Sequence, residues 1–331
     1  MKQALLIINL GTPDSTDAND VGRYLTEFLT DKHVIDLPYP LRQFLVRALI
    51  VPKRKFASAK KYKKVWLTEG SPLLHYTKSL SSKLDQTLDD IDVFFSMRYG
   101  NPKTSDVLKE ISHYDEIVVL PLYPHDTKSS YLTAKEQVEL FSRKYNISEK
   151  IRFIEPFYSE DFFIDSWVEK LKSQKPKIPA DFYLFSYHGI PLHHLPKECS
   201  SCKIPCSNLV KTSDCYRAQC YETTELIVKK MGLKEGQYMT SFQSRLGKRP
   251  WIKPYTDLVI EDLKQKGVKN LTVFSPSFIV DCLETLEELG MELKEDFEGQ
   301  SDEFKLNFIP CLNDEDLFVS KLGTFIKESR T

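Results

Sequence analysis

Residues 3–9 read QALLIIN, an apolar run that is followed by Gly11 and Pro13 and then by a segment, 17–30, with apolar side chains at helical spacing. A buried strand followed by a helix is the repeating unit of a parallel α/β sheet. The same alternation recurs along the chain. Further strands are expected near 91–97, 116–122, 151–155, 181–187, 271–276 and 305–309. Further helices are expected near 72–89, 103–112, 132–145, 160–173, 216–231, 253–267, 282–293 and 314–328.

This pattern predicts an α/β protein of two similar doubly wound (Rossmann-like) halves, with parallel sheets and a cleft between them. The expected ranges are 1–125 for the first half and 126–305 for the second, which includes a cysteine-rich loop at 199–220. Residues 306–331 are expected to form a last helix that packs back on the first half.

Composition excludes several classes of protein. The 331 residues carry 46 basic and 47 acidic side chains, so no overall field favours nucleic acid, and no nucleic-acid partner is expected. The first residues lack a cleavable signal pattern, and the apolar stretches are too short to span a membrane, which predicts a cytoplasmic protein. The 12 glycines form no GxGxxG, GxxxxGK or GxSxG motif, so dinucleotide, P-loop and nucleophile-elbow sites are not expected.

Five loops follow expected strands, at 9–13, 97–102, 121–125, 187–191 and 276–281, and three of them, 97–102, 121–125 and 187–191, carry His, Arg or Tyr side chains. Because ligands of open α/β sheets bind at the carboxyl ends of the strands, these loops are expected to converge on one site. Glycine and proline also mark strand ends without any functional role, which is the alternative interpretation.

His188 ends an expected strand, where its imidazole would project into the cleft. Asp281, Glu284 and Glu288 recur at i, i+3 and i+7, which predicts three carboxylates in one row of a helix. A carboxylate beside a histidine can pass protons or hold a cation. A structural histidine and a solvated acidic face are the commoner alternatives.

Residues 52–64, PKRKFASAKKYKK, carry seven basic side chains and follow the apolar stretch LPYPLRQFLVRALIV. An apolar stretch beside a basic one suits an anionic membrane surface or a large flat ligand with carboxylates. A helix with a solvated basic face is the alternative.

Five of the seven cysteines lie between Cys199 and Cys220. In a reducing compartment such clustering favours metal or cluster ligation over disulfides.

Taken together, NLGTP, GSP at 70–72, MRYGNP, PLYPH, SYHGIP, YRAQC, PWIKP at 250–254 and DCLETLEEL resemble the ferrochelatases, which insert ferrous iron into a porphyrin in haem biosynthesis. The motifs occur in the family's order along nearly the whole chain. The resemblance implies that His188 acts on the pyrrole protons or the iron, and that Glu284 is the family's motif glutamate. It also implies that Glu288 and Asp281 line a path for protons or metal. Contacts with the porphyrin are implied for Leu10, Arg54, Arg98, Tyr99, Tyr123 and Trp251. Cys282 stands where the family commonly has a second histidine.

The spacing C-x2-C-x3-C-x8-C of Cys199, Cys202, Cys206 and Cys215 resembles the internal [2Fe-2S] site of some bacterial ferrochelatases. Four thiolates also suit structural Zn²⁺, and spacing does not separate the two. Cys220 is a reserve ligand, whereas Cys282 and Cys311 are expected to be unligated.

The resulting expectation is a cytoplasmic ferrochelatase, peripherally associated with the inner membrane, that acts on Fe²⁺ and on protoporphyrin IX or coproporphyrin III. The apolar stretch at 37–51 favours protoporphyrin. A cobalt chelatase of corrin synthesis and a non-catalytic tetrapyrrole or iron sensor are the alternatives. The sequence leaves monomer and homodimer open.

Overall fold

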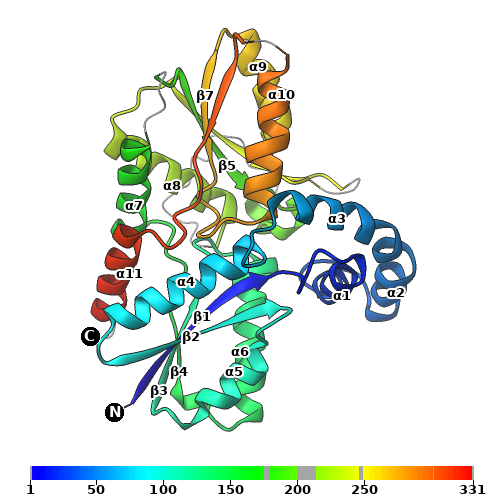
Figure 1. Cartoon of the computed structure of the whole chain (residues 1–331), viewed down its shortest axis with the longest axis vertical. Helices are drawn as coiled ribbons and strands as arrows, with labels where there is room; N and C mark the ends of the chain where they lie inside the picture. Colours follow the sequence, from blue (N-terminus) through cyan, green and yellow to red (C-terminus); the bar gives the residue numbers. More distant parts are fainter. Residues whose placement is uncertain (1, 175–178, 200–213, 246–248, 301, 330–331) are drawn as a thin grey trace. The chain divides into compact units, whose positions relative to one another are not determined.

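A computed structural model describes the chain apart from residues 1, 175–178, 200–213, 246–248, 301 and 330–331 (Figure 1). The chain forms two compact units. Unit 1 comprises Met1–Tyr123, Thr127–Pro156 and Asp314–Thr331, and unit 2 comprises Pro124–Asp126 and Phe157–Asn313. Each unit has a four-stranded sheet of its own.

The sheet of unit 1 contains β1 (Gln3–Gly11), β2 (Ile91–Tyr99), β3 (Glu116–Pro121) and β4 (Ile151–Phe153). Its helices are α1 (Ala18–Leu29), α2 (Tyr39–Phe44), the π-helix η1 (Leu45–Ile50), α3 (Val51–Val65), α4 (Pro72–Thr87), α5 (Thr104–Glu110), α6 (Thr133–Lys144) and α11 (Asp316–Glu328). Short helical turns η2 (Ile111–His113), η3 (Lys128–Leu132) and η4 (Ser148–Lys150) complete the unit. Residues 127–156, which we expected in the second half, cluster with unit 1 because β4 pairs with β3.

Both faces of the unit 1 sheet are covered. Ala4, Leu6 and Ile8 of β1 pack against α5 and α6. The alternate residues Leu5 and Ile7 point to the opposite face, on the side of α4, and are also fully buried. This double burial explains why β1 is apolar throughout its centre, as is typical of parallel strands.

The sheet of unit 2 contains β5 (Phe182–His188), β6 (Tyr238–Gln243), β7 (Asn270–Phe274) and β8 (Lys305–Phe308). Its helices are α7 (Asp161–Ser173), η5 (Leu192–His194), η6 (Lys197–Cys199), α8 (Tyr216–Met231), α9 (Thr256–Gln265), the π-helix η8 (Glu284–Leu293) and α10 (Lys294–Glu298). Phe182 and Leu184 of β5 pack with α9 and η8. The other face of the sheet meets α7, where the rings of Trp167 and Phe274 lie 5.3 Å apart, and α8.

The two sheets have the same topology. The order is β2-β1-β3-β4 in unit 1 and β6-β5-β7-β8 in unit 2, and every pairing is parallel. The α/β class with two similar halves is therefore confirmed.

Three features differ from the expected pattern. The strand β6 was not expected, because its sequence YMTSFQ lacks a continuous apolar run. The segment from α2 to α3 is helical over its whole length, although no helix was among those expected there. The helix expected at 282–293 is a π-helix from Glu284 onward, and Asp281 lies before it. In the described part of the chain, no helix is long and apolar enough to cross a membrane.

Candidate functional site

The first strand of each unit lies at the point where the order of the strands reverses. β1 is flanked by β2 and β3, and β5 is flanked by β6 and β7, with chain connections running in opposite directions from each. Ligands of doubly wound sheets bind beyond the carboxyl end of such a strand. Leu10 lies at this end of β1 and His188 at this end of β5.

His188 is the last residue of β5 and pairs in register with Gln243, the last residue of β6. Its backbone N–H donates to Oγ of Ser277 at 3.0 Å. Its carbonyl oxygen accepts from the hydroxyl of Tyr216 at 2.7 Å. Side chains from two other segments therefore hold both backbone polar groups of His188.

The ring of His188 has a defined tautomer. Its Nδ1 lies 2.7 Å from the carbonyl oxygen of Gly189. A carbonyl oxygen only accepts, so Nδ1 carries the hydrogen and Nε2 keeps its lone pair. Burial lowers the pKa of His188 below its ordinary value, although the negative charge of Glu284 and the Gly189 carbonyl act in the opposite direction. The imidazole is thus neutral at pH 7, with Nε2 as its basic atom.

Gly189 allows the chain to pass close to β6. Its N–H donates to the carbonyl oxygen of Gln243 at 2.9 Å. A Cβ at this position would lie only 2.7 Å from that oxygen and 3.3 Å from the ring of Trp251. Only glycine fits between the end of β6 and Trp251 without displacing them.

Trp251 lies in a segment that braces the His188 loop. Ile252 N donates to Ile190 O at 3.0 Å, and Leu192 N donates to Pro250 O at 3.0 Å. The two segments form an antiparallel bridge at Pro191 and Trp251. The structure thus brings the expected site residue Trp251 next to the His188 loop.

The three expected carboxylates have different partners. Glu284 begins η8, and its charge acts on His188. Glu288 accepts a hydrogen bond from Oγ of Ser244. Asp281 is buried and accepts from Thr285 Oγ1 at 2.9 Å, from the N–H of Cys311 at 3.1 Å and from Asn313 Nδ2 at 2.7 Å. Asp281 therefore connects the start of η8 to residues 311–313 by hydrogen bonds.

Gln243 links Glu284 to the strand that ends in His188. Its Oε1 accepts from Ser186 Oγ at 2.6 Å, and its Nε2 donates to the carbonyl oxygen of Glu284 at 3.1 Å.

Cys282, at the position where a histidine was expected from the family, is buried beside Glu284, and burial raises the pKa of its thiol well above the ordinary value.

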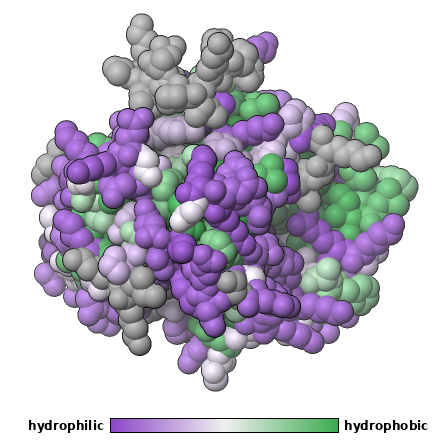
Figure 2. Space-filling view, turned by 90° about the horizontal axis from the view of Figure 1, so that it is seen from above, coloured by the Kyte–Doolittle hydropathy of each residue, from purple (hydrophilic) through white to green (hydrophobic). Residues whose placement is uncertain are grey.

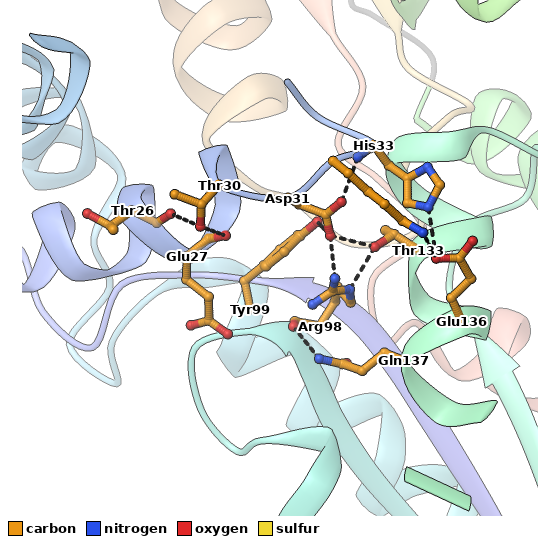
Figure 3. A network of polar contacts seen from close by, with 11 residues as sticks. Thr26, Glu27, Thr30, Asp31, His33, Arg98, Tyr99, Thr133, Glu136 and Gln137 are labelled. Atoms are coloured by element: carbon orange, nitrogen blue, oxygen red, sulfur yellow. Dashed lines mark hydrogen bonds and ion pairs between the residues drawn. The ribbon is translucent and has the colours of Figure 1, made fainter. Parts of the chain in front are cut away.

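In unit 1 the expected residues Arg98 and Tyr99 belong to a polar network around Asp31 (Figure 3). Asp31 accepts from the guanidinium of Arg98, from Tyr99 OH at 3.0 Å, from Thr133 Oγ1 at 2.7 Å and from the N–H of His33 at 2.7 Å. The side chain of Asp31 is 6% exposed and that of Arg98 is 15% exposed. Arg98 and Asp31 therefore form a mostly buried ion pair, and Tyr99 is buried beside them.

The other expected residues of unit 1 occupy different environments. Leu10 is partly exposed and packs against the core between β1 and α5–α6. Tyr123 is buried in the same core, and burial raises the pKa of its hydroxyl. Arg54 is exposed on α3. Of these three, Leu10 is the one that lies at the carboxyl end of a strand.

Two of the four cysteines expected as cluster ligands, Cys202 and Cys206, lie outside the described residues. Cys199 and Cys215 are buried, and so is Cys220. In the part of the chain that the structure describes, no three His, Cys, Asp or Glu side chains are arranged to hold a metal ion.

Sequence reasoning missed Gln243, Tyr216 and Asp31 as parts of these arrangements. Gln243 was missed with its strand, because YMTSFQ has neither a continuous apolar run nor a strict alternation of apolar and polar residues. Asp31 follows α1 in a loop, and no local pattern indicates its distant partners Arg98 and Thr133.

The fold is similar to that of known chelatase-like structures. SirB from Bacillus subtilis with Fe³⁺ has a TM-score of 0.58 at 9% identity, with 99% of this chain and 96% of that chain covered. A multi-domain protein from Deinococcus radiodurans with structural similarity to chelatases has a TM-score of 0.53 at 11% identity. That match covers 100% of this chain and 56% of the Deinococcus chain. At these identities the likeness concerns the fold alone.

Sequence comparison is more specific. The family model for ferrochelatase matches residues 2–330. A ferrochelatase from Legionella pneumophila (strain Paris) is 42% identical over 333 residues, with 99% of each chain covered. A ferrochelatase from Coxiella burnetii (strain Dugway 5J108-111) is 41% identical over 339 residues, with 99% of this chain and 94% of that protein covered. This chain therefore belongs to the ferrochelatase family.

Proposed function

We propose that this ferrochelatase inserts Fe²⁺ into protoporphyrin IX and that His188 is its general base. The observation that carries the proposal is the fixed tautomer of His188, in which Nε2 keeps its lone pair beside the charge of Glu284. Metal insertion replaces the two pyrrole N–H protons of the porphyrin by one Fe²⁺ ion, so two protons must leave the site. A neutral imidazole can accept such a proton, and the carboxylate of Glu284 stabilises the imidazolium that results.

The remaining carboxylates divide into two roles. Glu288 lies one turn after Glu284 on the same π-helix and is partly exposed, which suits a group that passes protons or iron onward. Asp281 has both of its oxygens occupied by three donors, which suits a positioning role at the start of that helix. Leu10 and Trp251 are partly exposed apolar side chains that suit contact with the macrocycle.

The choice of protoporphyrin rests on charge and apolar surface. Arg47 and Lys55 line a pocket of about 660 Å³ beside α1, and they supply positive charge for two propionate groups. Helix α2 exposes Tyr39, Leu41 and Phe44, which suit a less carboxylated porphyrin. An anaerobic steady-state assay with Fe²⁺ and each porphyrin tests this. We expect a higher kcat/KM for protoporphyrin IX than for coproporphyrin III, and the reverse order would contradict the proposal.

We also propose that the same helices bind a membrane surface peripherally. Their large apolar side chains Tyr39, Leu41, Phe44, Leu49 and Phe56 are between 48% and 68% exposed. Figure 2 shows apolar side chains gathered at the right edge of the view, the side on which α2 lies in Figure 1. The basic residues of 52–64 adjoin them, and this combination favours anionic lipid. We expect co-sedimentation with phosphatidylglycerol vesicles and not with phosphatidylcholine vesicles. Equal binding to both would contradict the electrostatic part of the proposal.

We propose further that Cys199, Cys202, Cys206 and Cys215 hold a [2Fe-2S] cluster. What supports this is their spacing and the burial of Cys199 and Cys215, the two that the structure describes. Buried thiolates shield a cluster from solvent and oxidants. We expect anaerobically purified protein to show visible charge-transfer absorption and two iron atoms per chain, both lost in Cys215→Ser. A colourless protein with one zinc atom per chain would contradict the proposal.

A further inference from the structure

The peptide group between His188 and Gly189 is held at both of its polar atoms. The carbonyl oxygen of His188 accepts from Tyr216 OH at 2.7 Å, and the N–H of Gly189 donates to Gln243 O at 2.9 Å. The next carbonyl, that of Gly189, accepts from Nδ1 of His188 at 2.7 Å. The carbonyl of Gly189 belongs to the following peptide, so the hold on the His188–Gly189 peptide acts on the imidazole by positioning Gly189.

Tyr216 is the member of this arrangement that comes from a distant segment. It is the first residue of α8 and is 4% exposed. Its ring packs edge-on against that of His125, with 5.9 Å between ring centroids. The carbonyl of His188 lies at the end of a strand, where no further ladder bond is available to it.

The first turn of α8 also holds both described ends of the cysteine segment 199–215. Cys215 is the residue directly before Tyr216. Arg217, directly after Tyr216, donates from its guanidinium to the carbonyl oxygen of Cys199 at 2.7 Å. Three consecutive residues thus connect the cysteine segment to the backbone of His188.

We propose that Tyr216 is a positioning residue, whose hydroxyl holds the His188–Gly189 peptide so that Nε2 of His188 is the basic nitrogen. The inference rests on the proposed role of His188 as the base. Tyr216 acts through the backbone of His188. Loss of its hydroxyl frees the His188 carbonyl, lets the peptide rotate, and weakens the Nδ1–H hydrogen bond that fixes the tautomer.

The test is Tyr216→Phe in the full-length protein. We expect kcat for anaerobic iron insertion to fall by about tenfold with KM for porphyrin unchanged, because a small displacement of a base mainly affects the chemical step. We also expect long-range ¹H–¹⁵N spectra of ¹⁵N-histidine-labelled protein to show His188 shifting from the pure Nδ1–H tautomer to a mixture. A structural role alone would not change that spectrum. Wild-type kcat with an unchanged tautomer would overturn the proposal.

Tyr131→Phe is the matched control. Tyr131 is equally buried, and its hydroxyl also donates to a backbone carbonyl, that of Ile154 at 3.3 Å, but it lies in unit 1. It should leave both kcat and the His188 spectrum unchanged. The variant His188→Asn distinguishes a failure of the proposed base from a failure of the proposed positioning role of Tyr216. If that variant keeps full activity, the function of His188 is wrong, whereas an inactive His188→Asn beside a fully active Tyr216→Phe removes only the positioning role.

Discussion

Replacing His188 by asparagine is expected to lower kcat for iron insertion by about 10²-fold or more, the usual loss when a general base is removed. The asparagine amide can still donate to the carbonyl oxygen of Gly189, as Nδ1 of His188 does at 2.7 Å. What the variant removes is Nε2, the atom with the free lone pair. KM for porphyrin should therefore change little, because binding of the macrocycle does not depend on that atom. Initial rates under anaerobic conditions, measured over a range of porphyrin concentrations, separate kcat from KM.

His113→Asn serves as the control for this variant. Nδ1 of His113 also lies beside a backbone carbonyl, that of Glu110 at 3.0 Å, but the residue is exposed in unit 1. It should retain the wild-type rate. A His188→Asn protein that is folded by circular dichroism and keeps more than about half of the wild-type kcat would show that another group accepts the protons.

The strands with the clearest signal in the sequence are those buried on both faces. Residues of β1, β3 and β5 are apolar at nearly every position, because helices cover both sides of each sheet. β6 has only one neighbouring strand, β5, and threonine, serine and glutamine make up three of its six residues. The other edge strands β2, β4 and β8 were predicted, so the polar composition of β6 is what removes its apolar signal.

The part of the site that could be predicted is the part that follows a recognisable strand. His188 was found because it ends β5, and Glu284 because it lies in an acidic repeat and in a family motif. The expected single row of carboxylates did not allow for a helix that begins only after Asp281 and has the wider π-helical turn. The sheet brings Gln243 to His188, and α8 brings Tyr216 to it. Contacts between residues so far apart in the chain produce no periodic pattern that a single sequence could show.

The same limitation applies to Arg98 and Tyr99, which were expected to face the porphyrin. Both precede a turn at the end of β2, which is the correct place for ligand contact. Their principal partner, Asp31, lies more than sixty positions away in sequence. A buried arginine needs a counterion, and a single sequence does not reveal which of many acids supplies it.

Asp31→Asn is expected to destabilise unit 1 by about 3 kcal/mol, the loss typical of removing one partner of a buried ion pair. The variant leaves the guanidinium of Arg98, only 15% exposed, without its counterion. It also replaces one of the two acceptor oxygens by an NH₂ group, so either the His33 N–H or the hydroxyls of Tyr99 and Thr133 lose their acceptor. Urea unfolding at pH 7, followed by circular dichroism, measures the change.

The effect of Asp31→Asn should depend on pH in a defined direction. Burial alone would raise the pKa of Asp31, but the hydrogen bonds from the His33 N–H and Thr133, the charge of Arg98 and the Tyr99 hydroxyl lower it below 3.8. A carboxyl with a lowered folded-state pKa contributes its full stability above its unfolded-state pKa, about 3.9, and loses it as the pH falls through the folded-state value. The difference between wild type and variant should therefore be constant from about pH 5 to pH 7 and shrink below about pH 4.

Asp257→Asn separates this effect from the general cost of losing a negative charge. Asp257 pairs with Arg245 at 2.6 Å, but the two side chains are 52% and 46% exposed, so water already solvates both charges. Exposed pairs of this kind contribute about 1 kcal/mol or less, and the control should lie within that range at every pH. If Asp31→Asn were as mild as Asp257→Asn at pH 7, then Asp31 would not be the counterion that keeps Arg98 in place. The arginine would then be free to contact the porphyrin, as the resemblance to the ferrochelatases implies.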